Sequence, residues 1–184
     1  SLVSFEEVVG AGSGSMLDLG KARRLFVADG KADEALKVLD QLVGFKKYPA
    51  VAALRGRILA EQMKLDELVL WSEELPPEIQ EHPEYWLAIG LWCAHEERDQ
   101  EAVRALAESI ILDPTNRRAV RALAATFGRL GDTQSAKKSQ KVLGILDSIF
   151  REASSADAAQ SMRIGTELQQ LQRLWESVVW FRNS

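Results

Sequence analysis

The chain has 184 residues, 46% of them hydrophobic, so it is long enough to bury a core as one domain or as a short array of repeats. A net charge of −4 argues against a general attraction to nucleic acid, and a single cysteine excludes an intrachain disulfide or a multi-cysteine metal site. No apolar run reaches the roughly 18 residues of a membrane span, and no signal peptide is visible, so we expect no membrane insertion and favour a cytoplasmic location.

The N-terminus divides by composition into two short segments. Residues 1–9 are apolar and acidic, and residues 10–15 have the glycine and serine content of a flexible linker. Met16 follows directly, which is typical of a peptide fused through a tether to a separate protein. A natural N-terminus or a tag remnant is the alternative interpretation.

Four helical hairpins are predicted between residues 16 and 147. They cover about 17–44, 50–75, 84–112 and 116–147. Pro49 separates the first two hairpins, and Pro76–Pro77 stand where the second should end, because proline cannot continue a helix. Thr115 or Asn116 can cap the fourth hairpin by accepting a hydrogen bond from a free backbone N–H.

The third hairpin, Tyr85–Pro114, carries the most informative pattern. Its first helix places Trp86, Ile89, Gly90 and Cys93 on one face, and its second does the same with Ala102, Leu106 and Ser109 before Pro114 ends the unit. This order resembles the tetratricopeptide repeat (TPR) family. The resemblance implies antiparallel helix pairs stacked into a right-handed solenoid, an all-α fold. Gly90 and Ala102 would be the close-contact points between the paired helices.

The same positions recur along the chain at a spacing of 34 residues, or 33 at the first step. The matching sets are Leu19, Arg23, Phe26 and Ala35; Ala52, Gly56, Leu59 and Leu68; and Val120, Ala124, Phe127 and Ala136. Gly30 and Gly131 stand at the turns of the first and fourth hairpins, whereas the second lacks a turn glycine. Arg23 occupies a position where the pattern expects a small residue.

A C-terminal capping helix is predicted in the region 148–184, at about 156–181. Ile164, Leu168, Leu171, Trp175 and Val178 recur there at three and four residues, which predicts a buried stripe. Solenoids require such an end piece, because the last repeat otherwise exposes its apolar face.

The sequence offers little for catalysis, so we expect no enzyme, no cofactor and no metal. Cys93 falls on an interior face, and His95 lies two residues away, where a helix turns it aside. Adjacent pairs such as Glu73–Glu74 and Glu96–Glu97 point in different directions. No phosphate loop, nucleophile elbow or metal-ligand spacing is present.

Charge is distributed unevenly along the chain. Acidic residues dominate from 61 to 101, and basic residues dominate from 104 to 151. In TPR-like arrays the first helix of each pair lines a concave groove, and the periodicity then predicts these groove residues: Arg24, Arg57, Leu87, Leu91, His95, Arg118, Arg121 and Arg129. The groove would be apolar at its centre and basic along part of its length, which suits carboxylates through bidentate bonds.

We therefore expect a non-catalytic scaffold that binds a peptide segment of a partner protein. Two alternatives stay open: a self-assembly module that packs through its terminal helices, and a regulatory or targeting domain of a larger enzyme. Residues 1–9 can themselves represent the ligand, with Phe5 as the apolar anchor and Glu6 and Glu7 as the carboxylates that meet groove arginines.

Overall fold

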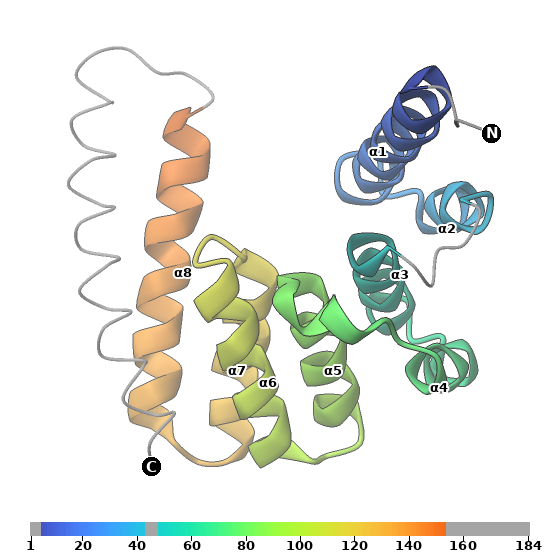
Figure 1. Ribbon diagram of the computed structural model, residues 1–184. Helices are drawn as coiled ribbons and strands as arrows, with labels where there is room; N and C mark the ends of the chain where they lie inside the picture. Colours follow the sequence, from blue (N-terminus) through green and yellow to red (C-terminus); the bar gives the residue numbers. More distant parts are fainter. Residues whose placement is uncertain (1–4, 43–47, 154–184) are drawn as a thin grey trace. The chain divides into compact units, whose positions relative to one another are not determined.

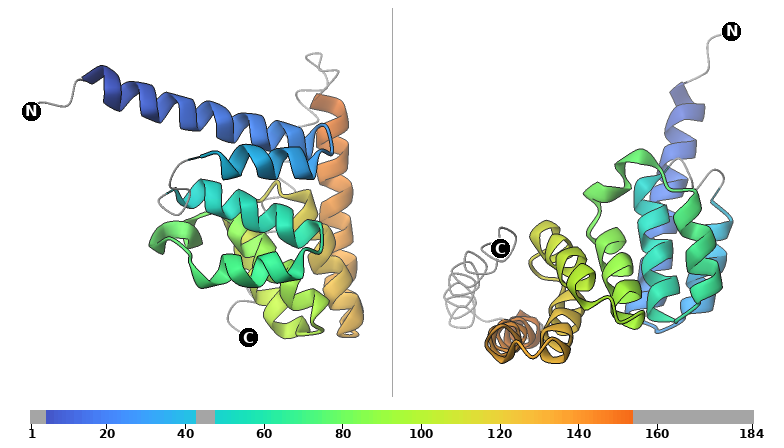
Figure 2. Two further views of the ribbon diagram at one scale, coloured as in Figure 1. Left: turned by 90° about the vertical axis from the view of Figure 1, so that its right-hand side faces the viewer. Right: turned by 90° about the horizontal axis from the view of Figure 1, so that it is seen from below.

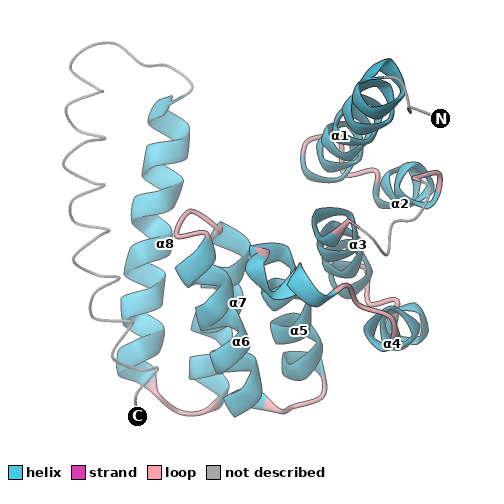
Figure 3. Cartoon of the chain, viewed as in Figure 1, coloured by secondary structure: helices cyan, strands magenta, loops and turns pink. Residues whose placement is uncertain are grey.

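Every regular element that the structure describes is helical. The computed structural model describes residues 5–42 and 48–153, and side chains within them from Met16 onward. The helices are α1 (Phe5–Val27), α2 (Ala32–Asp40), α3 (Pro49–Glu61), α4 (Leu65–Glu73), the short 3-10 helix η2 (Pro77–Glu81), α5 (Pro83–His95), α6 (Asp99–Leu112), α7 (Arg117–Arg129) and α8 (Thr133–Ala153). No strand occurs in these ranges, which confirms the all-α prediction (Figure 3).

The chain separates into two compact units, divided inside α5. The N-terminal unit is Ser1–Ala88 and the C-terminal unit is Ile89–Ser184. Within the N-terminal unit, α1 packs on α2 and α3 packs on both α4 and η2; within the C-terminal unit, α7 packs on α6 and α8. The left panel of Figure 2 shows α1 to α4 lying side by side in chain order.

The helix boundaries repeat with the predicted period. The first helices of the last three hairpins begin at Pro49, Pro83 and Arg117, 34 residues apart each time. Their second helices begin at Leu65, Asp99 and Thr133, again 34 apart. Proline at the start of α3 and α5 is compatible with a helix, because the first turn has no intrahelical partner for that N–H.

Each hairpin turns through one residue in the left-handed backbone region. These residues are Gly30 (φ 67°), Met63 (φ 57°), Glu97 (φ 59°) and Gly131 (φ 77°), and they recur at the same period. The N–H after each of the last three donates back to the preceding helix: Lys64 to Leu59, Arg98 to Cys93 and Asp132 to Phe127, at 3.0, 2.9 and 3.0 Å. This is the Schellman arrangement, so the second hairpin makes its turn without the usual glycine.

The paired helices approach each other closely at two glycines of the repeat. A β-carbon added to Gly56 would overlap the indole of Trp71, and one added to Gly90 would lie 2.6 Å from Cγ of Leu106. Trp71 is held in place because its Nε1–H donates to the carbonyl of Ala52 at 2.8 Å. The predicted close contact at Gly90 is confirmed within the C-terminal unit.

The repeat positions of the second helices form a buried series. Ala35, Leu68 and Ala102 have no exposed surface, and Ala136 is only 8% exposed. The first hairpin departs from the pattern at Arg23, as the sequence indicates. Its guanidinium stays exposed and lies 2.7 Å from Glu84, whose side chain is 8% exposed. A salt bridge therefore occupies a position where other hairpins bury a small residue.

Both ends of the array differ from the predicted boundaries. The structure has α1 running from Phe5 to Val27, so the segment predicted as a linker, residues 10–15, lies inside a helix. Glycine and serine lower helix propensity by at most about 1 kcal/mol per residue and do not forbid the conformation. At the other end α8 continues to Ala153. The predicted cap at 156–181 lies outside the described residues.

Candidate peptide-binding surface

The eight predicted groove residues fall into two sets. Arg24, Arg57 and Leu87 belong to the N-terminal unit, and Leu91, His95, Arg118, Arg121 and Arg129 belong to the C-terminal unit. We describe each set within its own unit.

Arg57 on α3 is half-buried and already engaged. Its Nε donates to Oε1 of Glu61, one turn later, at 2.9 Å. Its guanidinium carbon lies 5.5 Å from the ring centroid of Phe26 on α1, which adds a cation–π contact. Arg24, on the same helix as Phe26, is exposed. An acidic ligand would therefore meet Arg24 directly but would have to compete with Glu61 for Arg57.

Leu87 lies in the core. It has no exposed surface, so it cannot touch a bound peptide in this conformation. The helical periodicity that assigned Leu87 to the groove gives the direction of a side chain around its own helix. It does not show how closely the neighbouring elements cover that direction.

Arg129 at the end of α7 braces three helix ends of the C-terminal unit. Its Nε and Nη2 both donate to Oδ1 of Asp99 on α6, at 2.9 and 2.5 Å. Nη2 also lies 3.5 Å from the carbonyl oxygen of Ala94 on α5. The hydrogen bond from Asp99 raises the pKa of Arg129 above its ordinary value. Its geometry therefore assigns Arg129 a bracing role within the unit.

Four groove residues keep exposed surface in the C-terminal unit. On α7, Arg121 is exposed and Arg118 is half-buried; on α5, His95 is exposed and Leu91 is half-buried. Each pair is separated by three or four residues, so its members share one face of their helix. The two faces combine an apolar side chain, an imidazole and two guanidinium groups. That is the chemistry needed to hold an apolar residue and a carboxylate.

Sequence reasoning missed a second arginine contact on α7. Nη1 of Arg117 lies 3.1 Å from Oδ1 of Asp147 on α8, and its guanidinium carbon lies 4.2 Å from the ring centroid of Phe150. Arg117 and Asp147 are 30 residues apart, as are Asp99 and Arg129. A search for opposite charges at that separation would have found both pairs.

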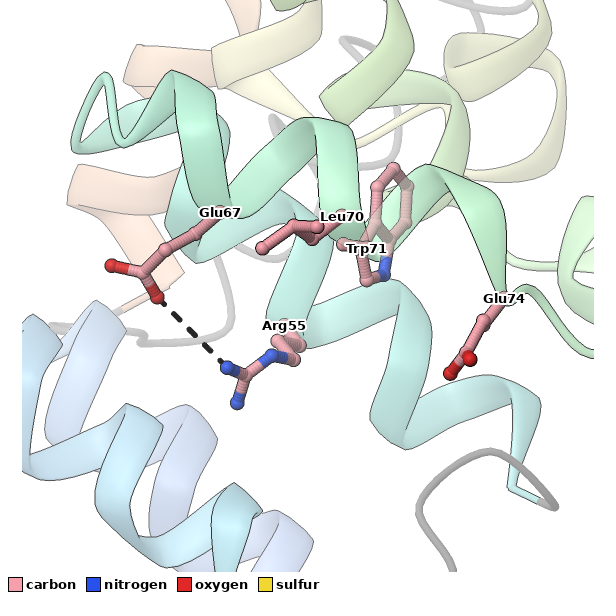
Figure 4. A pocket seen from close by; sticks show the side chains of 5 residues that line it. All are labelled: Arg55, Glu67, Leu70, Trp71 and Glu74. Carbon is pink, nitrogen blue, oxygen red and sulfur yellow. Dashed lines mark ion pairs between the residues drawn. The ribbon is translucent and has the colours of Figure 1, made fainter.

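Sequence reasoning also missed a pocket in the N-terminal unit. Arg55 on α3 faces one side of α4, which contributes Glu67, Leu70 and Trp71, with Glu74 directly after the helix (Figure 4). The guanidinium of Arg55 pairs with Asp40 on α2 and lies 3.9 Å from Glu67. The signal was available in the sequence, since residues 67, 70, 71 and 74 follow helical spacing.

Potentially reactive side chains are shielded. Cys93 is 3% exposed, and burial raises the pKa of its thiol, which disfavours the nucleophilic thiolate. Burial likewise raises the pKa of Tyr85. Within residues 16–42 and 48–153, no three His, Cys, Asp or Glu side chains are placed to hold a metal ion, and no helix is long and apolar enough to cross a membrane.

Comparisons with protein-family models, with curated proteins and with solved structures returned no match for this chain. Membership of the TPR family therefore stays a prediction from the repeat pattern.

Proposed function

We propose that the protein is a non-catalytic interaction scaffold, a right-handed TPR-like solenoid that binds a peptide segment of a partner through the first helices of its hairpins. The period of the hairpins supports this proposal most directly. Helix starts, left-handed turn residues and glycine contacts all recur at 34 residues. Arrays of this kind present equivalent faces of successive helices side by side, which makes an extended binding surface.

The chemistry of the exposed residues defines the ligand. Arg118 and Arg121 offer planar guanidinium groups on one face of α7, and such groups bind carboxylates through paired hydrogen bonds. Leu91 on α5 offers partly exposed apolar surface. We therefore propose a peptide in which acidic residues stand beside apolar ones.

Residues 1–9 provide a probe with this chemistry. A blocked peptide, Ser-Leu-Val-Ser-Phe-Glu-Glu-Val-Val, would be titrated by calorimetry into the chain that begins at Met16. We expect binding that weakens when Phe5→Ala is made in the peptide or Arg121→Glu in the protein. Arg104→Glu is the matched control, because Arg104 is exposed on a second helix, α6.

Two results would contradict the proposal. One is the absence of measurable binding at about millimolar peptide, the effective concentration that a short tether would supply. The other is an equal loss of affinity in the Arg121 and Arg104 variants, which would show non-specific attraction to positive charge.

A further inference from the structure

The pocket between α3 and α4 has the features of a separate binding site. It encloses about 230 Å³ and is lined by Arg55, Glu67, Leu70, Trp71 and Glu74. That volume accommodates a single side chain, well below the roughly 300–1,000 Å³ of small-molecule sites. Figure 4 shows Glu67 and Glu74 on opposite sides of Leu70 and Trp71, with Arg55 facing them.

The walls of the pocket suit a long alkyl chain. Leu70 is 65% exposed although it is apolar. Beside it the Trp71 ring is fixed by its hydrogen bond to Ala52 and by its contact with Gly56. A flexible methylene chain that entered the pocket would cover Leu70 against a rigid wall, which is how lysine and arginine stems bury apolar surface.

The charge around the pocket selects a cation. The positive charge of Arg55 faces Asp40 and Glu67, and Glu74 adds a further carboxylate. The exposed acidic residues on α4 and η2 outside the pocket are Asp66, Glu73, Glu78 and Glu81. The one basic residue between 62 and 81 is Lys64, whose Nζ is 2.8 Å from Asp33. Negative charge of this extent disfavours a carboxylate and attracts an ammonium or guanidinium group.

We propose that this pocket receives a lysine or arginine side chain from a partner protein, with an apolar residue next to it covering Leu70. The basic ligand differs in charge from the acidic peptide proposed for the α5 and α7 faces. The two surfaces therefore bind opposite kinds of segment, and each can be tested without the other.

The test begins with a phage-displayed peptide library selected against the full chain. We expect enriched sequences with lysine or arginine beside a leucine, isoleucine, valine, phenylalanine or methionine. One such peptide would be synthesised and its affinity measured by fluorescence anisotropy. Glu67→Gln combined with Glu74→Gln should weaken binding by about tenfold or more, because two charge-assisted hydrogen bonds lose their charge.

Matched controls come from the same helix. Glu73→Gln combined with Glu78→Gln removes equal charge outside the pocket, and Val69→Ser compares with Leu70→Ser because Val69 is exposed but does not line it. Bound peptide should also shift the indole N–H resonance of Trp71 in an NMR spectrum, while that of Trp92 in the C-terminal unit stays unchanged.

Three results would overturn the proposal. They are a selection without basic residues, affinities lowered equally by the control variants, and an unmoved Trp71 resonance. If the mass of the protein in sedimentation rises with concentration, and the Glu67 and Glu74 variant abolishes that rise, the occupant is a second copy of this chain. The assignment to a partner protein would then be wrong.

Discussion

Gly90 and Leu106 are in contact so close that Gly90 has no room for a side chain. A β-carbon at Gly90 would lie 2.6 Å from Cγ of Leu106 and 3.2 Å from its backbone nitrogen. Leu106 is fully buried, so neighbouring atoms limit its movement. The distance between α5 and α6 at this point therefore depends on glycine.

We predict that Gly90→Leu lowers the free energy of unfolding by about 1–3 kcal/mol through overpacking. The control is Gly128→Ala on α7, where an added β-carbon meets nothing within 4 Å. That change should stabilise the protein by up to about 1 kcal/mol, because alanine favours helix. Urea denaturation measures both. Equal stability of the two variants would show that the Gly90 contact is wrong.

A second prediction concerns Met63, which adopts φ 57° at the turn between α3 and α4. A residue with a β-carbon pays roughly 1–2 kcal/mol in this region, whereas glycine pays roughly 0.5–1 kcal/mol in lost chain entropy. Met63→Gly should therefore raise the free energy of unfolding by some tenths of a kcal/mol to about 1 kcal/mol. Met63→Ala keeps the β-carbon and should give no such gain. A gain from alanine equal to that from glycine would show that side-chain loss, and not backbone conformation, is responsible.

The sequence predicted the hairpins well because their signals are local. Prolines, turn residues and apolar positions at a period of 34 placed each predicted boundary of the last three hairpins within a few residues, up to the start of α8. Asn116 was predicted as a possible cap, and its side chain accepts the N–H of Ala119 at 3.1 Å. Each of these features depends on residues close together in the chain.

The candidate site was harder to predict, because its properties depend on residues far apart in the sequence. The burial of Leu87 reflects the elements packed around it, and the pairing of Arg129 reflects a carboxylate 30 residues away. The extent of α1 shows a different limit. Composition gave residues 10–15 the character of a linker, but a glycine-rich segment continuous with a helix can also be helical.

A third prediction concerns the pH dependence of the cap at the start of α8. Hydrogen bonds from the Ser135 hydroxyl and then its backbone N–H lower the pKa of Asp132 below its ordinary 3.8. The ionised form is thus favoured in the folded state. Its contribution is present above the unfolded pKa and is lost as the pH falls through the lower folded value.

Asp132→Ala should therefore cost about 1 kcal/mol near neutral pH, the usual contribution of a helix cap, and less as the pH falls below 3.8. Asn116→Ala is the control, because an amide cap does not titrate in this range. Urea denaturation at several pH values measures both costs. A cost for Asp132→Ala that stays constant down to about pH 2 would contradict the proposed role of its charge.

The last prediction separates bracing from binding at the two exposed arginines of α7. Arg129 makes two hydrogen bonds to Asp99, whose side chain is 14% exposed, so this pair should exceed the small value of a fully exposed ion pair. A double-mutant cycle with Asp99→Asn and Arg129→Gln should give a coupling energy of about 1 kcal/mol that falls in high salt. Arg129→Lys should lose most of it, because an ammonium group cannot form the fork. Arg121→Gln should leave the free energy of unfolding nearly unchanged and weaken binding of the acidic nonapeptide, while Arg129→Gln should do the reverse. The opposite assignment of effects would move Arg129 into the binding surface and make Arg121 part of the brace.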